Sequence, residues 1–311
     1  MDEKNKCDFL SISDLQKKEL VGLLMLATML KDELKTFGRN DPVLAGRTLA
    51  MLFEKPSLRT RVSFEVGMVQ LGGHAVYLNP IDIGLGVRES VSDVARVAGS
   101  MADALMARVH KHETLTELAK YAGKPVINGL SDLEHPCQTL ADLLTMQEAK
   151  GDISNLTVAF VGDGENNIVH SLALAGTLMS FHLRVAAPTG YWMNAGIAKQ
   201  TSAIELMDPK EAVEGADVVY TDTWVSMGDE KEKEKRLNDF SAYQVTAKLM
   251  KLAKSDAIFL HDLPAYRGRE VSADVIDGPQ SLVFQQAENR LHAQKALLVY
   301  LLSDAKGGEG V

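Results

Sequence analysis

The sequence predicts an α/β protein built from two doubly wound parallel-sheet domains, and three observations support this prediction. Short apolar runs typical of buried strands alternate with segments of helical spacing, which is the pattern of a parallel sheet covered by helices. At 311 residues, 46% of them hydrophobic, the chain can bury two cores of medium size. A long helical pattern at about 136–150 separates two series of such strands.

The first series of strands is expected in four apolar runs. They are GRTLAMLF at 46–53, HAVYLN at 74–79, ALMARV at 104–109 and PVINGL at 125–130. The turn EKPSLRT at 54–60 connects the first strand to a helix expected at 60–73, which stops at Gly72 and Gly73. We expect residues 1–140 to form the first domain.

The second series follows the helix expected at 136–150, which ends before Gly151. Its strands are expected in LTVAFVGDG at 156–164, LRVAAP at 183–188, DVVYTD at 217–222 and AIFLHDLP at 257–264. Residues 141–285 are expected to form the second domain. The last helix, at about 286–302, is expected to pack back on the first domain, so residues 286–311 belong with that domain.

Charge and cysteine content exclude several classes of protein. A net charge of −9 argues against a surface for nucleic acid or anionic membranes, because such binding needs excess positive charge. Two cysteines are too few for a disulfide framework and are typical of a reducing compartment. We find neither a signal-peptide pattern nor the ~18 consecutive apolar residues of a membrane span, which predicts a soluble cytoplasmic protein. The charge run DEKEKEKR at 229–236 is interpreted as a solvated loop or helix face.

The turn between the first strand and its helix concentrates hydrogen-bond donors and positive charge. A helix start offers unpaired backbone N–H groups and the positive end of the helix dipole. Ser57 and Thr60 add hydroxyl groups, and Arg59 adds a planar guanidinium. We interpret this turn as a phosphate-binding site, the alternative being a helix cap with surface arginines. Arg61 is placed to pair with Glu65 four residues later.

Another group of polar side chains lies at the start of the helix expected at 136–150. Pro136 is a favoured first helical residue, which places His135 and Gln138 at the helix start. Histidine and glutamine can together hold a carbonyl oxygen and an amide, although a single histidine at this position is more often a helix cap. Cys137 is interpreted as a small buried hydrophobic residue rather than a nucleophile.

Polar residues also follow the strands of the second domain, where open α/β sheets bind ligands. The segment FVGDGENN lacks the spacing of a dinucleotide motif and instead presents Asn166 and Asn167. Asp222, Ser226 and Asp262 follow two later strands. Carboxylates at this edge suit an amine substrate, whereas either aspartate alone is more often a helix cap or a turn residue.

Six motifs, in this order, closely resemble the ornithine branch of the aspartate/ornithine carbamoyltransferase family. They are FEKPSLRTRVSFE, HPCQTLADLLT, FVGDGENN, YTDTWVSMG, HDLPAYRG and AENRLHAQKALL. The resemblance extends over about residues 8–303, and the ordered set is highly specific. It implies a carbamoyl-phosphate-binding domain at 1–140, with the last helix at 286–311, and an ornithine-binding domain at 141–285.

The resemblance also implies a set of site residues. Those for carbamoyl phosphate are Ser57, Leu58, Arg59, Thr60, Arg108, His135, Gln138 and Arg290. Those for ornithine are Asn167, Asp222, Ser226, Met227, Asp262 and Leu263. Among all of these, Arg108, His135 and Asp262 would be catalytic.

The implied activity is transfer of the carbamoyl group of carbamoyl phosphate to the side-chain amine of L-ornithine, giving citrulline and phosphate. No metal and no organic cofactor are expected. The implied assembly is a homotrimer, or a multiple of trimers, with active sites between subunits. The implied place in metabolism is arginine biosynthesis or its catabolic counterpart.

Four positions depart from the pattern of the family. Leu58 replaces a threonine, Gly84 a polar residue and Asp262 a cysteine, while Glu165 is a one-residue insertion. These departures leave two alternatives open: a carbamoyltransferase for another amine, such as putrescine or an acylated ornithine, and a non-catalytic chain that binds carbamoyl phosphate. An ionised Asp262 favours the unreactive ammonium form of the amine, so we expect lower activity at neutral pH than a cysteine would give.

Overall fold

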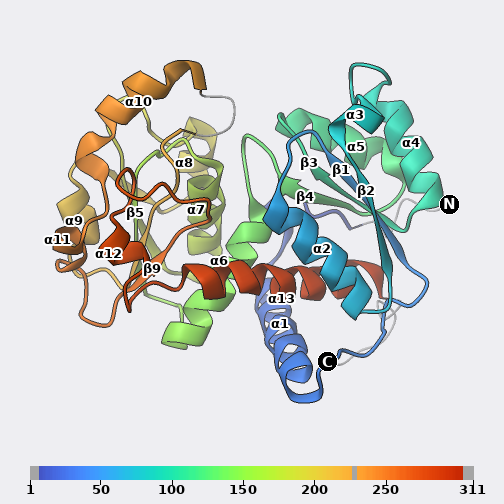
Figure 1. Ribbon diagram of the computed structural model, residues 1–311, viewed down its shortest axis with the longest axis horizontal. Coiled ribbons are helices and arrows are strands. Elements are labelled where there is room, and N and C mark those ends of the chain that lie inside the picture. Colours follow the sequence, from blue (N-terminus) through green and yellow to red (C-terminus); the bar gives the residue numbers. More distant parts are fainter. Residues whose placement is uncertain (1–6, 226–229, 304–311) are drawn as a thin grey trace. The chain divides into compact units, whose positions relative to one another are not determined.

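Two parallel sheets form the framework of the molecule. The structure, a computed structural model, describes residues 7–225 and 230–303 (Figure 1). The chain divides into two compact units, Met1–Ala141 with Asn289–Val311, and Asp142–Glu288. Each unit holds one sheet of parallel strands with helices around it, which confirms the predicted fold class. The assignment of one substrate to each domain, within the predicted limits, stays a prediction.

The first unit contains a four-stranded sheet with the order β2-β1-β3-β4. Its strands are β1 (Thr48–Phe53), β2 (His74–Leu78), β3 (Ala104–Arg108) and β4 (Val126–Leu130). Its helices are α1 (Lys17–Phe37), α2 (Leu58–Gln70), α3 (Pro80–Ile83), α4 (Val91–Met101) and α5 (His112–Ala122). Two more helices, α6 (Pro136–Lys150) and α13 (Val283–Leu302), contribute residues to both units. All four strands lie inside the apolar runs in which the sequence predicts them.

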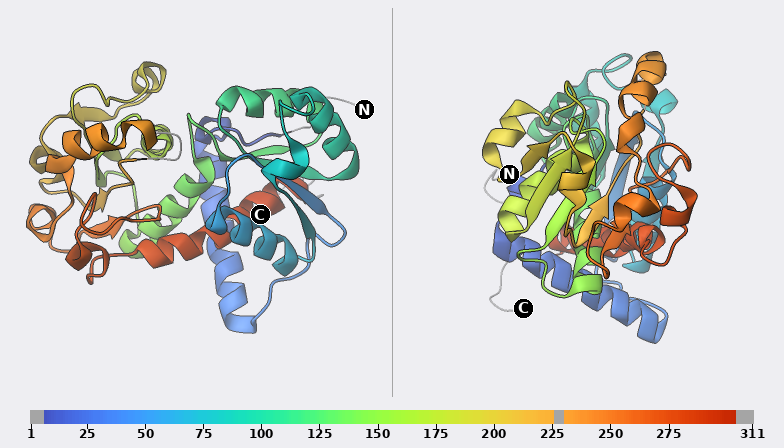
Figure 2. Two further views of the ribbon diagram at one scale, coloured as in Figure 1. Left: turned by 45° about the horizontal axis from the view of Figure 1, so that its top comes forward. Right: turned by 90° about the vertical axis from the view of Figure 1, so that its left-hand side faces the viewer.

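Helices cover both faces of this sheet. Successive side chains of a strand point to opposite faces. Ala50 and Leu52 of β1 belong to a buried cluster with Val94 of α4 and Leu115 of α5. Phe64 is buried on α2, which lies on the other face (Figure 1, Figure 2). Because both faces are covered, the strands read as continuous apolar runs rather than as alternating patterns.

The strand order places the polar motifs of the first unit at one edge of the sheet. The chain passes from β1 outward to β2 and then returns across to β3, so the order reverses between β1 and β3. Ligands of open α/β sheets bind outside the carboxyl ends of the strands at such a reversal. The turn that leads into α2 follows β1, and Arg108 is the last residue of β3. Two of the predicted binding elements therefore flank this point.

The second unit contains a five-stranded sheet with the order β7-β6-β5-β8-β9, which reverses between β5 and β8. Its strands are β5 (Thr157–Val161), β6 (His182–Ala186), β7 (Ile204–Leu206), β8 (Val218–Tyr220) and β9 (Ile258–Leu260). Its helices are α7 (Asn167–Met179), α8 (Ala195–Gln200), α9 (Pro209–Val213), α10 (Lys233–Asp239), α11 (Ala247–Met250) and α12 (Ala273–Ile276). Strand β7 is not predicted from the sequence, because this edge strand is only three residues long and contains Glu205.

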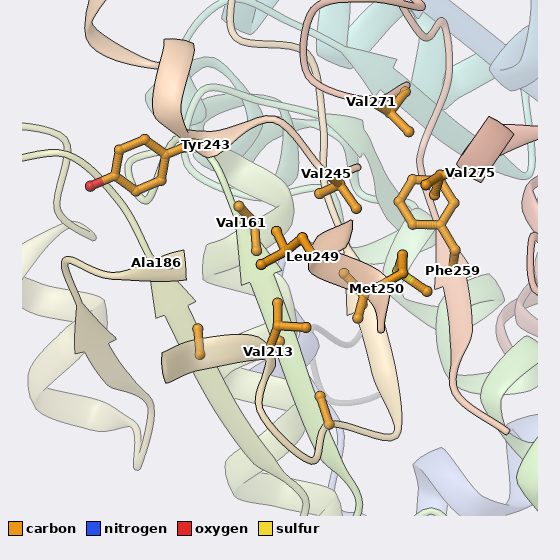
Figure 3. Packing of buried hydrophobic residues seen from close by; sticks show 14 of the residues in the cluster. Val161, Ala186, Val213, Tyr243, Val245, Leu249, Met250, Phe259, Val271 and Val275 are labelled. Carbon is orange, nitrogen blue, oxygen red and sulfur yellow. The ribbon is translucent and has the colours of Figure 1, made fainter. Parts of the chain in front are cut away.

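The second sheet packs on a core that includes helices α9, α11 and α12. Figure 3 shows Leu249 and Met250 of α11 beside Val161 of β5. Val213 of α9 and Val275 of α12 belong to the same buried cluster. Burial of an aliphatic side chain of this size contributes roughly 1.5–3 kcal/mol. The core thus fixes the strands whose carboxyl ends carry the polar residues of this unit.

The last helix packs back on the first unit, as the sequence predicts. It begins at 283 rather than at 286, and from Asn289 onward it belongs to that unit. The Lys295 ammonium donates hydrogen bonds to the side-chain oxygens of Asn40, over 2.6 Å, and of Gln70, over 3.0 Å. None of the helices in the described parts of the chain is long and apolar enough to cross a membrane.

Helix α2 begins two residues earlier than the sequence predicts. It starts at Leu58, so the last three residues of the predicted turn, 58–60, are already helical. Beyond its end, Gly72 has φ +80°, and a Cβ there would lie 2.5 Å from the Cβ of Pro42, so only glycine fits. The expected surface pair forms, because Arg61 Nε donates to Glu65 Oε1 over 3.0 Å.

Candidate functional site

The start of α2 combines a helix cap with a group of donors. Ser57 is the N-cap, because its Oγ accepts a hydrogen bond from the Thr60 N–H over 3.3 Å. The same hydroxyl donates to Thr60 Oγ1 over 3.1 Å. Leu58 and Arg59 are the first helical residues, so their backbone N–H groups lie at the positive end of the helix dipole. The capping alternative is therefore realised at Ser57, while phosphate binding by this turn stays a prediction.

Arg290 connects three segments that are far apart in the sequence. Its side chain is 1% exposed, and its Nη1 donates to Gln138 Oε1 over 2.7 Å. Its Nη2 donates to Thr60 Oγ1 over 3.3 Å, and its Nε donates to Gln294 Oε1 over 2.9 Å. The guanidinium of Arg290 thus connects the last helix to the first turn of α2 and to the start of α6, within the first unit.

His135 is a neutral imidazole in a cluster of arginines. It is buried directly before α6, where its C=O accepts a hydrogen bond from the Gln138 N–H over 3.0 Å. Burial lowers the pKa of His135 well below its usual value. The charges of Arg290, Arg108 and Arg59 lower that pKa further. Because three arginines act on one imidazole, they create a positive potential that suits an anion.

The residues predicted to bind carbamoyl phosphate therefore lie together in the first unit. Hydrogen bonds or electrostatic interactions connect Ser57, Arg59, Thr60, Arg108, His135, Gln138 and Arg290. The side chain of Leu58 is 75% exposed, so this residue offers the group its backbone N–H. No polar side chain occupies that position of the turn.

Cys137 is the small buried residue that the sequence predicts. It is inaccessible, and its thiol donates to the Asn128 C=O over 3.3 Å. Burial raises the pKa of the Cys137 thiol to about 12, so it stays protonated and is a poor nucleophile. In the residues that the structure describes, no group of three or more His, Cys, Asp and Glu side chains is placed to hold a metal ion.

The second unit gathers polar residues after β5 and β8. Asn166 is the N-cap of α7, and its Oδ1 accepts a hydrogen bond from the Ile168 N–H over 2.7 Å. Its Nδ2 donates to Asp222 Oδ2 over 2.8 Å. Asn167, which the resemblance assigns to ornithine, is the first residue of α7 and is half-buried. The bond between Asn166 and Asp222 is not predicted from the sequence, although the two residues follow neighbouring strands.

Asp222 carries a carboxyl group that titrates just below neutral pH. Its side chain is buried, and this burial raises the pKa of Asp222 to about 6. The hydrogen bond from Asn166 opposes the rise in this pKa, whereas the negative charge of Asp262 adds to it. Asp222 is therefore mostly ionised at pH 7 and becomes protonated in mildly acidic solution.

His261 links the carboxyl ends of β8 and β9. Its Nδ1 accepts a hydrogen bond from the Leu263 N–H over 2.8 Å, so Nε2 carries the proton and donates to Glu270 Oε1 over 3.3 Å. The same Nδ1 lies 3.8 Å from Asp222 Oδ1. Asp262 is half-buried, and Leu263 has φ +62°, an uncommon conformation that is enriched at ligand sites. His261 is not among the predicted site residues, although its position directly after β9 is a signal for one.

A second buried polar cluster was also not predicted. Gln286 Nε2 donates to Asp142 Oδ1 over 2.7 Å and to the Tyr220 hydroxyl over 3.0 Å. Gln286 Oε1 accepts a hydrogen bond from the His261 N–H over 2.9 Å. Burial raises the pKa of Tyr220 well above its usual value, and nearby carboxylates, first that of Asp142, raise it further. Tyr220 therefore stays protonated, and the cluster fixes the ends of β8 and β9 next to one another.

Two of the four departures from the family pattern have a structural explanation. Glu165 is exposed, and its N–H donates to Asp163 Oδ1 over 3.0 Å, so the turn absorbs the insertion. Gly84 has φ +55°, and a Cβ there would lie 2.7 Å from the Cβ of Arg88, so this turn requires glycine.

The predicted ornithine contacts Ser226 and Met227 lie outside the described residues. The other four, Asn167, Asp222, Asp262 and Leu263, all lie in the second unit.

Two family models match the chain. Residues 7–148 match that of the carbamoyl-P binding domain of aspartate/ornithine carbamoyltransferase. Residues 154–301 match that of the Asp/Orn binding domain of the same family. The second match includes most of α13, whose residues from Asn289 onward pack in the first unit.

Individual proteins are similar over almost the whole chain. The chain is 52% identical to the ornithine carbamoyltransferase of Anoxybacillus flavithermus, over 95% of this chain and 96% of that protein. It is 50% identical to the anabolic ornithine carbamoyltransferase of Pyrococcus furiosus, over 96% of this chain and 97% of that protein. A solved structure of ornithine carbamoyltransferase from Pyrococcus furiosus superimposes with a TM-score of 0.93 at 48% identity, covering 98% of this chain and all of that one.

Proposed function

The chain belongs to the aspartate/ornithine carbamoyltransferase family, and we propose that it transfers the carbamoyl group of carbamoyl phosphate to the side-chain amine of L-ornithine. The products are citrulline and phosphate. The observation that carries this proposal is the Arg290 guanidinium, which contacts both Thr60 of the phosphate turn and Gln138 of α6. The names of the relatives support ornithine as the acceptor and give no support to another amine or to a non-catalytic chain.

Carbamoyl phosphate is bound by the first unit in this proposal. The hydroxyls of Ser57 and Thr60 and the backbone N–H of Leu58 donate to the phosphate, and Arg59 supplies a paired charge. Arg290 adds a further contact to the phosphate. The potential that lowers the pKa of His135 supports this assignment, because it favours a dianion in the same place.

The carbamoyl end is held by Arg108, His135 and Gln138. Attack of the amine forms a C–N bond and a tetrahedral oxyanion, which then collapses as the C–O bond to phosphate breaks. Arg108, His135 and Thr60 donate hydrogen bonds to the developing oxyanion. The lowered pKa of His135 supports this role, since a neutral imidazole donates without losing its proton. Removing one such donor typically slows the reaction about 10²–10³-fold.

Ornithine is bound by the second unit in this proposal. The Asp222 carboxylate pairs with an ammonium group of the substrate, and Asn167 and Leu263 add contacts. Ser226 and Met227 are assigned to the same substrate from the family motif alone. The buried carboxyl of Asp222 supports the assignment, because a desolvated charge that faces a cation gives a strong pair.

The reacting amine must lose a proton before it attacks. Its pKa resembles the ~10.4 of lysine, so it is mostly protonated at neutral pH. Asp262 accepts this proton, but its charge also stabilises the ammonium form. Each unit by which the pKa of the bound amine rises costs about 1.4 kcal/mol in the reactive form. We therefore expect the rate at saturating substrates to keep rising above neutral pH.

The enzyme assembles as a homotrimer or as a multiple of trimers. An exposed apolar stripe on α2 supports this proposal, because its residues recur at helical spacing on one side of the helix. They are Leu58, Val62, Val66 and Val69, which are 75%, 46%, 36% and 66% exposed in the single chain. Light scattering coupled to size-exclusion chromatography should give a multiple of three times the 33.9 kDa chain mass. A monomeric mass at micromolar concentration would rule this assembly out.

We also place the enzyme in the cytoplasm and in arginine biosynthesis. The word anabolic in the name of the Pyrococcus furiosus relative supports the biosynthetic direction. A net charge of −9 disfavours nucleic acids and anionic membranes as partners.

A substrate panel tests the proposed activity. The purified protein is incubated with carbamoyl phosphate and, in turn, L-ornithine, putrescine and an Nα-acylated ornithine, and the carbamoylated product is measured by mass spectrometry. We expect citrulline from ornithine at a kcat/KM at least tenfold above that for either other amine. A preference for putrescine or acylated ornithine would reassign the acceptor, and no product with any amine would favour the non-catalytic alternative.

A further inference from the structure

Arg236 is buried, although it ends a charge run that the sequence predicts to be solvated. Residues 231–235 of that run are exposed, as expected. Arg236 departs from the prediction, because it is only 6% exposed and its guanidinium points into the second unit. It packs over the rings of Tyr191, at 5.0 Å, and Phe240, at 5.4 Å. A buried arginine of this kind is expected to have a specific polar partner.

Two polar partners of Arg236 come from segments that lead to the ornithine-binding residues. Its Nη2 forms an ion pair with Oδ2 of Asp163, in the turn after β5. Its Nε donates to the C=O of Trp224, over 2.6 Å. Trp224 follows Asp222 by two residues, so one contact of Arg236 fixes the backbone next to that carboxylate.

Asp163 is connected to the Asp222 carboxylate through a second set of hydrogen bonds, by way of Asn166. Its Oδ1 accepts a hydrogen bond from the Glu165 N–H over 3.0 Å, and its C=O accepts one from the Asn166 N–H over 3.3 Å. Asn166 in turn donates from Nδ2 to Asp222 Oδ2 over 2.8 Å. The contacts therefore close a ring from Arg236 through Asp163 and Asn166 to Asp222, and back through the Trp224 carbonyl.

The ion pair between Arg236 and Asp163 contributes more to the arrangement of the chain than to the free energy of unfolding. Asp163 and Arg236 are 7% and 6% exposed, so both charges lose most of their hydration. Burial raises the pKa of Asp163 even though the guanidinium opposes that rise. Buried ion pairs of this kind often contribute little net stability compared with apolar residues of similar size, but they do constrain the arrangement of the chain.

We propose that Arg236 is a positioning residue that holds Asp222 in the orientation in which it binds the ammonium group of ornithine. The inference rests on the proposed function, in which Asp222 contacts ornithine. Arg236 itself touches no substrate. It acts on one side of Asp222 through Asp163 and Asn166, and on the other through the backbone of Trp224.

The test compares Arg236→Lys with the wild type. Lysine keeps the positive charge for Asp163, but its single ammonium cannot also donate in the direction of the Trp224 carbonyl. We expect the KM for ornithine to rise about tenfold or more, the loss expected when one hydrogen bond to a charged group is misplaced. The dissociation constant of carbamoyl phosphate, measured by calorimetry, should stay within about twofold of the wild-type value because its predicted residues lie in the other unit.

Arg184→Lys is the matched control. Arg184 lies in the same unit, and its Nη1 also donates to a backbone carbonyl, that of Glu214, over 2.8 Å. In the described part of the chain Arg184 forms no hydrogen bond or ion pair with the ring around Asp222, so its substitution should leave the KM for ornithine and the affinity for carbamoyl phosphate unchanged. An equal rise of the ornithine KM in both variants would show a general effect of arginine removal and would overturn the inference.

A second variant covers the case in which Arg236→Lys does not fold. The double variant Asp163→Asn with Arg236→Met removes both charges, so neither is left buried without its partner. The asparagine keeps an oxygen for the Glu165 N–H. We expect this protein to fold and to show the same selective loss for ornithine, whereas wild-type affinity for ornithine would contradict the proposal.

Crystal structures of the wild type and the variant separate this inference from the proposed function. We expect the bond from Asn166 Nδ2 to Asp222 Oδ2 to be broken, or lengthened beyond hydrogen-bond distance, in Arg236→Lys. An unchanged bond would refute the positioning role whatever the activity. If the wild type makes no citrulline but the bond still breaks in the variant, the proposed function fails and the structural role of Arg236 stands.

Discussion

Replacing Asp262 by asparagine should change how ornithine binding depends on pH. The substitution removes a negative charge while it preserves the size of the side chain. The pKa of Asp222, about 6, is raised first by burial and further by the charge of Asp262. Without that charge the pKa of Asp222 should fall, and Asp222 should stay ionised in more acidic solution.

The size of the effect follows from the pKa of Asp222. With a pKa of about 6, roughly nine-tenths of Asp222 is ionised at pH 7 and about one-tenth at pH 5. If only the carboxylate binds the ammonium group, the KM for ornithine should rise about tenfold from pH 7 to pH 5. If the pKa falls by about one unit in Asp262→Asn, about half of Asp222 stays ionised at pH 5, a roughly fivefold gain over the wild type.

The assay measures the KM for ornithine between pH 5 and pH 8 at saturating carbamoyl phosphate. Ornithine titrates identically for both proteins, so the ratio of the two KM values isolates the effect of the protein. We expect the ratio of variant to wild type to fall several-fold as the pH decreases from 7 to 5. Asp256→Asn, at an exposed residue paired with Lys150, serves as the control and should give a constant ratio. A constant ratio for Asp262→Asn as well would refute electrostatic coupling between Asp262 and Asp222.

Three further predictions concern the first unit. Arg59→Ala should abolish measurable binding of carbamoyl phosphate by calorimetry while circular dichroism stays unchanged, because the half-buried side chain supplies charge rather than core packing; unchanged affinity would exclude it from the site. Burial lowers the pKa of Lys295 from 10.5 to about 8. Between these two pH values the unfolded chain binds more protons than the folded one, so the free energy of unfolding should rise from about pH 8 to about pH 10.5. Lys295→Met should abolish that rise in urea titrations, and a rise of equal size in the variant would assign it to another group. Gly84→Ser, which restores a polar residue, should lower the free energy of unfolding by about 1–2 kcal/mol, because position 84 has a positive φ and an added Cβ meets Arg88. An unchanged thermal midpoint would contradict that reasoning.

The framework of the fold was predictable because its signals are local. Helix α6 starts at Pro136, as predicted, since proline is favoured at the first position of a helix and needs no partner for its missing N–H. The four strands of the first unit are apolar because helices cover both faces of their sheet. The start of α2 was misjudged, since Leu58 is apolar but exposed and carries no capping signal. The short edge strand β7 shows too little pattern to be recognised.

The site was predictable where the interacting residues belong to one short motif. It was less predictable where the two partners lie far apart in the sequence. Ser57 and Thr60 are three residues apart, so one turn of helix brings them together. The bond between Asn166 and Asp222 joins residues 56 positions apart and depends on the pairing of β5 with β8. The charge run predicts a solvated Arg236, and this prediction is wrong because the partner Asp163 lies 73 positions away in the sequence. Local charge pattern carries no information about a partner that only the sheet topology supplies.

The most direct test of the proposed activity follows the carbamoyl carbon itself. Carbamoyl phosphate labelled with ¹³C at the carbamoyl carbon is mixed with ornithine and the wild-type enzyme, and the reaction is followed by NMR together with a phosphate assay. We expect the label to appear in the ureido carbon of citrulline with one phosphate released per citrulline, and this transfer to be lost in Arg59→Ala. Label that remains in carbamoyl phosphate, or that is released as carbon dioxide and ammonia at the uncatalysed rate, would contradict the assignment of this chain as an ornithine carbamoyltransferase.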